Sequence, residues 1–137
     1  LANPSVDGLG RIGSLKRSVT LEEFCCLVKD ELSCKDIRVA GALSRPIKRV
    51  ALCSGSGREL LFTAISAQAD LYLTGELNYH DFITARENGL AVIAAGHWGT
   101  EHCFTDLMID YLNSYFKSEE KFEVIKGKSQ EEPYLTF

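Results

Sequence analysis

A regular alternation of strand and helix patterns from residue 48 onward is the feature that most constrains the fold of this sequence. Three short apolar runs are each followed by an amphipathic segment. The pairs are 48–53 with 58–67, 70–74 with 78–88, and 90–95 with 98–116. Strands that are apolar on both faces are typical of parallel sheets covered by helices on both sides. The alternation therefore predicts an α/β domain with a mostly parallel sheet.

Two further elements precede the alternation. Thr20 and Glu23 have the spacing of a capping box, and apolar residues then repeat with a helical period, so a helix is expected over residues 20–32. Residues 36–42 are a short run that contains the β-branched Ile37 and Val39, and they predict a strand. Because the link to the next strand is too short for a crossover helix, this strand is expected at a sheet edge or antiparallel to its neighbour.

The length of the chain predicts one domain. With 137 residues, 45% of them hydrophobic, the chain can bury one core and is too short for two ordinary domains. Residues 1–19 are expected to form a glycine-containing linker or loop, and residues 20–137 a single α/β domain. A short strand is expected at 122–127, before a polar tail. The chain lacks an initiator Met, which suggests a piece of a longer protein.

The composition argues against several classes of protein. A net charge of -4 provides no concentrated positive patch for nucleic acid or for an anionic membrane surface. No apolar run approaches the roughly eighteen residues that a membrane-spanning helix requires. The five cysteines are an odd number without a CxxC pair, which favours neither a disulfide framework nor a thiolate zinc site. We therefore expect a soluble, cytoplasmic protein with reduced cysteines.

Glycines and polar residues follow the strands of the alternation. Gly55, Ser56 and Gly57 lie between a strand and a helix, where backbone N–H groups favour an anion, and Thr74 ends the next strand. Ligands of parallel α/β sheets bind beyond the carboxyl ends of the strands, so these four residues are candidates for binding a substrate or anion. A tight turn with a serine cap explains the first loop about equally well. The GxGxxG of residues 8–13 does not predict dinucleotide binding, because no strand precedes it.

The last helix opens with "GHWGTEH". Helical projection places His97 and Glu101 in line with an apolar stripe that begins at Phe104, so both side chains are expected to point inward, whereas His102 projects to the surface. A buried carboxylate and imidazole must be paired, because leaving them unpaired is costly. They form either a hydrogen-bonded pair or two ligands of a divalent metal. The spacing alone leaves both alternatives open.

Five phrases of the chain together are specific: "GLGRIGSL", "RVALCSGSGRELL", "ADLYLTGELNYHD", "GHWGTE" and "EEPYLTF". They resemble the C-terminal half of the NIF-three-like family, whose bacterial members are often labelled GTP cyclohydrolase type-two homologues. The resemblance implies an α-β-(β-α)3 unit with a mixed, mostly parallel four-stranded sheet and helices on both faces. It also implies the C-terminal half of a two-unit protein that assembles as a homo-oligomer, often a toroidal hexamer.

The resemblance further implies a dinuclear metal centre between the two halves. The family's GHxxxE motif corresponds to His97 and Glu101, the pair that helical projection selects. The other ligands, a His-His pair and an Asp, belong to the N-terminal half, so this chain alone is expected to bind metal weakly or not at all. The family commonly has TGD where this chain has Glu76. His80 matches a histidine near the metals and is expected to transfer a proton or orient the substrate.

These features predict a metal-dependent hydrolase. In the intact protein two divalent ions, of Zn, Fe or Mn, would activate water against a nucleotide or phosphoester, in cyclohydrolase-like or phosphoesterase-like chemistry. The expected partner is a small-molecule or nucleotide substrate, with neither a membrane nor nucleic acid bound directly. The alternative is a non-catalytic metal-binding scaffold, in which a homo-oligomeric ring recruits a protein partner.

Overall fold

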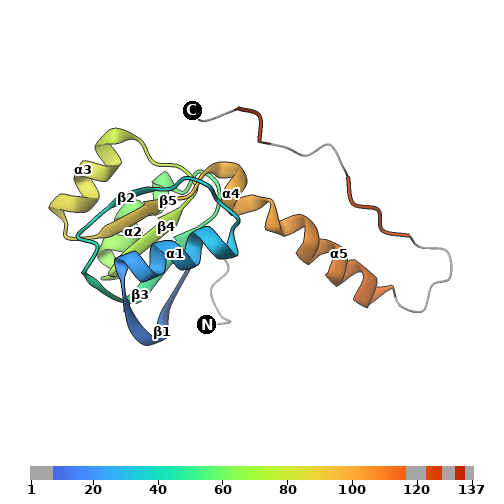
Figure 1. The fold of residues 1–137 in the computed structure, drawn as a ribbon, viewed down its shortest axis with the longest axis horizontal. Helices are drawn as coiled ribbons and strands as arrows, with labels where there is room; N and C mark the ends of the chain where they lie inside the picture. Colours follow the sequence, from blue (N-terminus) through green and yellow to red (C-terminus); the bar gives the residue numbers. More distant parts are fainter. Residues whose placement is uncertain (1–7, 117–122, 128–131, 135–137) are drawn as a thin grey trace.

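The strands form one mixed sheet in the order β1-β3-β4-β5-β2 (Figure 1). The computed structural model describes residues 8–116, 123–127 and 132–134. The strands are β1 (Arg11–Thr20), β2 (Arg38–Ala40), β3 (Pro46–Cys53), β4 (Leu71–Thr74) and β5 (Ala91–Ala94). The three central strands β3, β4 and β5 run parallel, and the outer strands β1 and β2 pair antiparallel with β3 and β5. The predicted mixed, mostly parallel sheet is confirmed.

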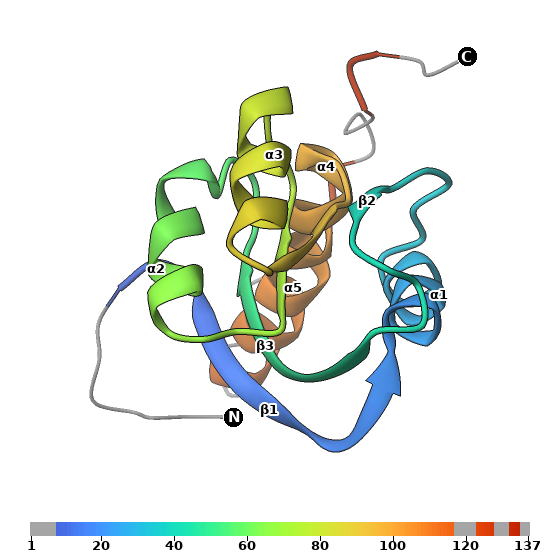
Figure 2. The same cartoon turned by 90° about the vertical axis from the view of Figure 1, so that its left-hand side faces the viewer.

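Helices cover both faces of this sheet. They are α1 (Leu21–Glu31), the 3-10 helix η1 (Arg58–Leu60), α2 (Leu61–Ser66), α3 (Tyr79–Glu87), α4 (His97–Glu101) and α5 (Cys103–Tyr115). Helix α1 lies on one face, and α2 and α3 lie on the other (Figure 2). The α/β class and the alternation of strands with helices are therefore as the sequence predicts.

Alternating side chains of the central strands divide the core into two clusters. Leu71 and Ile93 pack toward α1, whereas Tyr72 and Val92 pack toward α2 and α3. All four side chains are almost completely buried. A strand with both faces buried must be apolar throughout, which explains the continuous apolar runs of the sequence.

Local signals in the sequence set the ends of the helices. At the start of α1, the Thr20 hydroxyl accepts a hydrogen bond from Glu23 N at 3.1 Å, and the Glu23 carboxylate accepts one from Thr20 N at 2.8 Å. This reciprocal arrangement is the predicted capping box. Asn78 and Asp81 form a second one at the start of α3. The strand expected at 36–42 is also confirmed, as the short edge strand β2.

The sheet has five strands, whereas four were predicted. The additional strand is β1, so the prediction of a linker or loop for residues 1–19 is wrong from Arg11 onward; residues 1–7 lie outside the described part. An edge strand buries little, and only Leu15 and Val19 of β1 pack against the core. The pairing register also shifts between Ser14 and Val19. A strand with so weak an apolar pattern and an irregular ladder resembles a loop in sequence.

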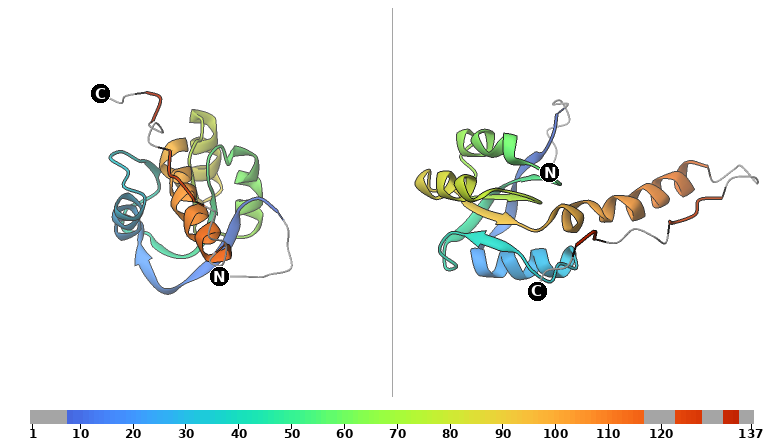
Figure 3. Two further views of the ribbon diagram at one scale, coloured as in Figure 1. Left: turned by 90° about the vertical axis from the view of Figure 1, so that its right-hand side faces the viewer. Right: turned by 90° about the horizontal axis from the view of Figure 1, so that it is seen from above.

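The predicted core-facing stripe of the last helix is wrong. The structure has two helices there, α4 and α5, and α5 extends away from the sheet (Figure 3). Five large apolar side chains of α5 are exposed: Phe104, Leu107, Met108, Tyr111 and Tyr115. The helical period correctly identifies an apolar face, but no strand of the described part lies against it. None of the described helices is long and apolar enough to cross a membrane.

The strand expected at 122–127 is not present in its described residues. Residues 123–127 have no strand pairing, and Phe122 lies outside the described part. This segment instead contacts α5 through an ion pair between Lys126 and Asp106. A single short apolar run is a weak predictor of a strand, because a strand also needs a neighbour with a free edge.

Candidate functional site

The loops that follow β3, β4 and β5 meet beyond the carboxyl ends of these strands, at one end of the sheet. The Gly55 carbonyl accepts hydrogen bonds from Gly75 N at 3.0 Å and from Glu76 N at 3.1 Å, and Gly96 N donates to the Gly75 carbonyl at 3.0 Å. A Cβ at Gly75 would lie 2.6 Å from Gly55 O and 2.9 Å from Gly96 O. Only glycine permits this close approach of three backbone segments.

Side-chain hydroxyls hold the first of these loops in place. Gly55 N donates to Thr100 Oγ1 at 2.9 Å, and Gly57 N donates to Thr74 Oγ1 at 3.1 Å. The Tyr72 hydroxyl donates to the Gly57 carbonyl at 2.6 Å. Burial raises the pKa of Tyr72 to about 12, so this phenol remains a neutral donor at physiological pH. The loop is therefore a rigid part of the site.

Two of the four residues predicted to bind an anion use their backbone N–H groups within the protein. Gly55 N and Gly57 N donate to threonine hydroxyls, and the Thr74 hydroxyl itself contacts the Gly55 carbonyl at 3.3 Å. Thr74 is also fully buried. Ser56 is exposed and lines an open pocket. Anion binding at this loop stays a prediction, and Ser56 is the best-placed residue of the four to contact a ligand.

His97 and Glu101 are the first and last residues of the short helix α4, and their side chains both lie against the same loop. His97 Nε2 is 3.2 Å from Glu101 Oε2, and His97 Nδ1 is 3.1 Å from Glu76 Oε2. The side chains of His97 and Glu101 are 46% and 48% exposed, so the expectation that they are buried is wrong. Since α4 lies at the end of the sheet, its first turn faces the meeting point of the loops. The predicted pair is nevertheless in contact.

The protonation state of His97 determines whether its contact with Glu101 is favourable. A neutral imidazole that donates its Nδ1–H to Glu76 presents a lone pair at Nε2. That lone pair would face the Glu101 carboxylate, which is also an acceptor, at 3.2 Å. Two acceptors at this distance repel each other unless a positive charge lies between them. A proton on Nε2 or a bound cation satisfies both groups.

The hydrogen bond that His97 donates to the Glu76 carboxylate raises the pKa of His97 above its ordinary value. Partial burial opposes this shift, and the charge of Glu101 adds to it. Sequence reasoning did not give Glu76 this role. Its position directly after a strand in the predicted row of functional loops was the available signal.

The donors of this cluster fit a divalent cation. Imidazole nitrogen and carboxylate oxygen are ligands that Zn, Fe and Mn accept, and residues four apart on a helix can reach one ion. Glycine at position 55 lets both side chains lie against the loop, because a Cβ there would collide with Glu101 Oε1 and lie 3.2 Å from His97 Nε2. Within the described part of the chain, no group of three or more His, Cys, Asp or Glu side chains converges as a complete metal site. His97 and Glu101 are thus the two candidate ligands that this chain contributes.

The other two histidines lie apart from this pair. His80 is exposed near the start of α3, where its ring contacts that of Tyr79 with a centroid distance of 5.6 Å. Among the described residues it makes no contact with His97 or Glu101, so its proton-transfer role stays a prediction. His102 is half-buried, and its ring stacks on Trp98.

Replacing Glu76 by glutamine is expected to lower the pKa of His97 in the metal-free protein. The raised pKa means that protonated His97 stabilises the fold below the ordinary histidine pKa, and this contribution is lost as pH rises through the raised value. Glu76→Gln removes the largest cause of the shift.

An NMR titration of the His97 ring protons measures this shift directly. Glu87→Gln is the matched control, because Glu87 is an exposed carboxylate at the far end of α3. An unchanged His97 midpoint in Glu76→Gln would contradict the orienting role of Glu76.

Comparison with known proteins gives one family and several similar proteins. The model of the Duf34/NIF3 (NGG1p interacting factor 3) family matches residues 2–133. NIF3-like protein 1 of Bos taurus is 36% identical over 130 residues, which are 92% of this chain and 33% of that protein. The GTP cyclohydrolase 1 type 2 homolog of Bacillus subtilis (strain 168) is 39% identical over 95 residues, 69% of this chain and 26% of that protein. The chain spans about a third or less of the length of these relatives.

A solved structure has the same fold. The crystal structure of a Bacillus cereus protein related to NIF3 superposes with a TM-score of 0.87 and 27% sequence identity. The match covers 95% of this chain and 36% of that one. The arrangement of loops and helices described above is therefore similar to a segment of a longer, experimentally determined protein.

Proposed function

The chain belongs to the Duf34/NIF3 family, and on that premise we propose that it supplies half of a dinuclear metal site in a hydrolase. The contact between His97 and Glu101 supports the metal site. The ligands that complete it would come from the part of the protein that this chain does not include.

One observation carries the proposal. His97 Nε2 and Glu101 Oε2 lie 3.2 Å apart at the end of the sheet where three strand-to-helix loops meet, and the glycine at position 55 lets both groups lie against the first loop. Parallel α/β sheets bind their ligands at this end, beyond the carboxyl ends of the strands. The two side chains are half-exposed and accessible to solvent, as a site that exchanges substrate must be.

Each residue of the cluster has a separate task in this proposal. His97 and Glu101 would hold the metal, and Glu76 would fix the His97 ring so that Nε2 faces Glu101. Bound divalent ions would supply Lewis acidity and make a water molecule more acidic. Thr100 secures the geometry, because its hydroxyl accepts a hydrogen bond from Gly55 N in the facing loop. In this proposal the residues of the cluster hold and orient the metal ligands, and none of them transfers a proton.

The proposed reaction is hydrolysis of a nucleotide or phosphoester. The name of the Bacillus subtilis relative refers to a cyclohydrolase, which acts on a nucleotide ring. The residues described here suit any reaction in which water attacks an electrophile next to an anionic group.

Turnover of a substrate panel tests this function. Full-length protein loaded with Mn, Fe or Zn is expected to hydrolyse at least one member of a panel of nucleotides and phosphodiesters. Treatment with a chelator should reduce the rate by more than about a hundredfold, since the ions supply the water activation. A protein that binds the metals and leaves every substrate unchanged would contradict the hydrolase proposal.

A metal-binding scaffold is the second candidate, and α5 favours it. Five large apolar side chains of this helix, between Phe104 and Tyr115, are exposed, and a contiguous apolar surface of this kind commonly marks an interface. In this alternative the stripe packs in a homo-oligomer, and the ions stabilise the assembly. The two candidates predict different results for substitutions at His97 and Glu101.

A further inference from the structure

A pocket beside the metal-ligand pair contains two arginines that the proposed function does not use. Its volume is about 330 Å³. The residues that line it are Arg38, Ser56, Arg58, Glu76, Leu77 and Asn78. Small-molecule sites have volumes from roughly 300 Å³ upward, so this pocket could hold part of a substrate.

Arg58 is held at one wall of this pocket by Asp81. Its Nε donates to Asp81 Oδ1 at 3.1 Å, and Asp81 is only 7% exposed. The other Asp81 oxygen accepts a hydrogen bond from Asn78 N at 2.9 Å, which fixes the carboxylate as the cap of α3. The terminal nitrogens of Arg58 form no hydrogen bond with the described residues. They remain available to a ligand.

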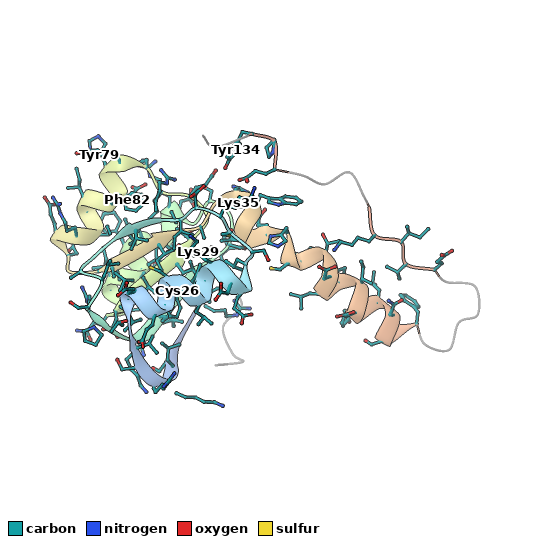
Figure 4. All side chains as sticks on the ribbon, viewed as in Figure 1. Cys26, Lys29, Lys35, Tyr79, Phe82 and Tyr134 are labelled. Carbon is teal, nitrogen blue, oxygen red and sulfur yellow. The ribbon has the colours of Figure 1, made fainter. Side chains whose placement is uncertain are left out.

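Arg38 is oriented differently, by an aromatic ring. Its guanidinium carbon lies 5.6 Å from the ring centre of Phe82, a residue of α3 that Figure 4 labels. Stacking on an aromatic face orients a guanidinium without using its N–H groups. Arg38 forms no ion pair with the described residues. The two arginines reach the pocket from β2 and η1 and are both braced by α3.

The same two loops contribute to the pocket and to the ligand pair. Ser56 lines the pocket, and the preceding residue, Gly55, lies against Glu101. Glu76 also lines the pocket, and its carboxylate contacts His97 Nδ1. A ligand in the pocket would therefore lie next to the metal-ligand pair. The negative charge of Glu76 is already engaged by His97, and that of Asp81 by Arg58.

We propose that Arg38 and Arg58, together with Ser56, form the subsite for a phosphate group of the substrate. Guanidinium groups bind phosphate through paired, charge-assisted hydrogen bonds, and a serine hydroxyl can add another. This inference rests on the proposed function for the identity of the ligand as a substrate. The backbone N–H groups of Gly55 and Gly57, which the sequence predicted to bind an anion, already donate to threonine hydroxyls. In this proposal the anion is bound by side chains of the adjacent pocket instead.

Phosphate binding to the metal-free, full-length protein tests the proposal without requiring turnover. The probes are inorganic phosphate and AMP, titrated by NMR and calorimetry after chelator treatment. The Arg38→Met and Arg58→Met substitutions retain much of the aliphatic stem and remove the charge. Each is expected to weaken binding of AMP about tenfold, and the double variant more. Arg58→Lys should recover only part of the affinity, because lysine lacks the planar fork.

Arg86→Met is the matched control, since Arg86 is an exposed arginine at the opposite end of α3. It should bind AMP as the unchanged protein does. The proposal is overturned if the metal-free protein binds neither probe, or if the double variant binds AMP normally. Turnover that persists in the double variant with unchanged KM would also overturn it, while leaving the hydrolase proposal standing. Arginine-dependent AMP binding without any turnover would support the subsite and count against the hydrolase.

Discussion

Replacing His97 by alanine, or Glu101 by glutamine, is expected to reduce metal-dependent turnover by more than about a hundredfold. Even partners outside the coordination sphere change metal affinity about 10- to 100-fold, so the loss of a ligand should exceed that range. His97 Nε2 and Glu101 Oε2 lie 3.2 Å apart, and no other described His, Cys, Asp or Glu completes a site with them. Calorimetric titration with Mn and Zn, together with the turnover rate, measures the effect.

The fold is expected to survive both substitutions. Both side chains are about half-exposed, and the residue that remains is left accessible to water, so no buried charge loses its partner. Substitutions at such positions usually change stability by less than about 0.5 kcal/mol. Asp110→Asn, at an exposed position of α5, is the matched control and should change neither metal binding nor turnover. Metal affinity that is unaffected in His97→Ala would show that the ligands lie elsewhere.

The same two variants separate the hydrolase from the scaffold. If turnover is lost and the oligomer persists in size-exclusion chromatography, the ions serve catalysis. If the oligomer dissociates, the ions are structural, and the exposed stripe of α5 becomes the surface to test next.

Gly75→Ala is expected to lower the free energy of unfolding by roughly 3 kcal/mol and to disrupt the metal-ligand pair. Its Cβ would lie 2.6 Å from Gly55 O, 2.9 Å from Gly96 O and 2.8 Å from Thr100 Oγ1. Two of these atoms are backbone, so no rotation of a side chain relieves the contact with all three. The loops after β3 and β5 must move apart, and α4 begins directly after Gly96.

Gly8→Ala controls for the change of residue type. A Cβ at Gly8 meets nothing within 4 Å, so this substitution should change stability by less than about 0.5 kcal/mol. Urea denaturation of the two variants gives the comparison. Equal stability would mean that the three loops can separate freely, and the site would then be less rigid than its hydrogen bonds indicate.

The sequence predicts the parts of this molecule that depend on local spacing. The capping box of Thr20 and Glu23 and the contact between His97 and Glu101 each follow from residues three or four apart in one turn of helix. The three strand-to-helix units follow from the period of their apolar residues. The position of the candidate site follows from the rule that ligands of parallel α/β sheets bind beyond the carboxyl ends of the strands.

The features that the sequence does not predict depend on what lies opposite a residue. The spacing from Phe104 to Tyr115 identifies an apolar face of α5, but a period contains no information about what covers that face. Likewise, Arg38 and Arg58 belong to different elements, and only the folded sheet brings them to one pocket. The strand β1 has few buried residues, so its sequence resembles that of a loop. It is a strand because it pairs with β3, a neighbour that is distant in the sequence.

The two edges of the sheet constrain how copies of this protein can associate. At one edge β1 carries the exposed charges of Arg11, Lys16 and Arg17 and has an interrupted register, and at the other β2 is only three residues long. Charged, irregular or very short edges discourage strand-by-strand addition of another chain, which is the usual route to amyloid-like aggregation. Growth of the sheet is thereby suppressed in both directions. Association through helices or loops, which can stop at a defined number of subunits, is favoured over open-ended polymerisation.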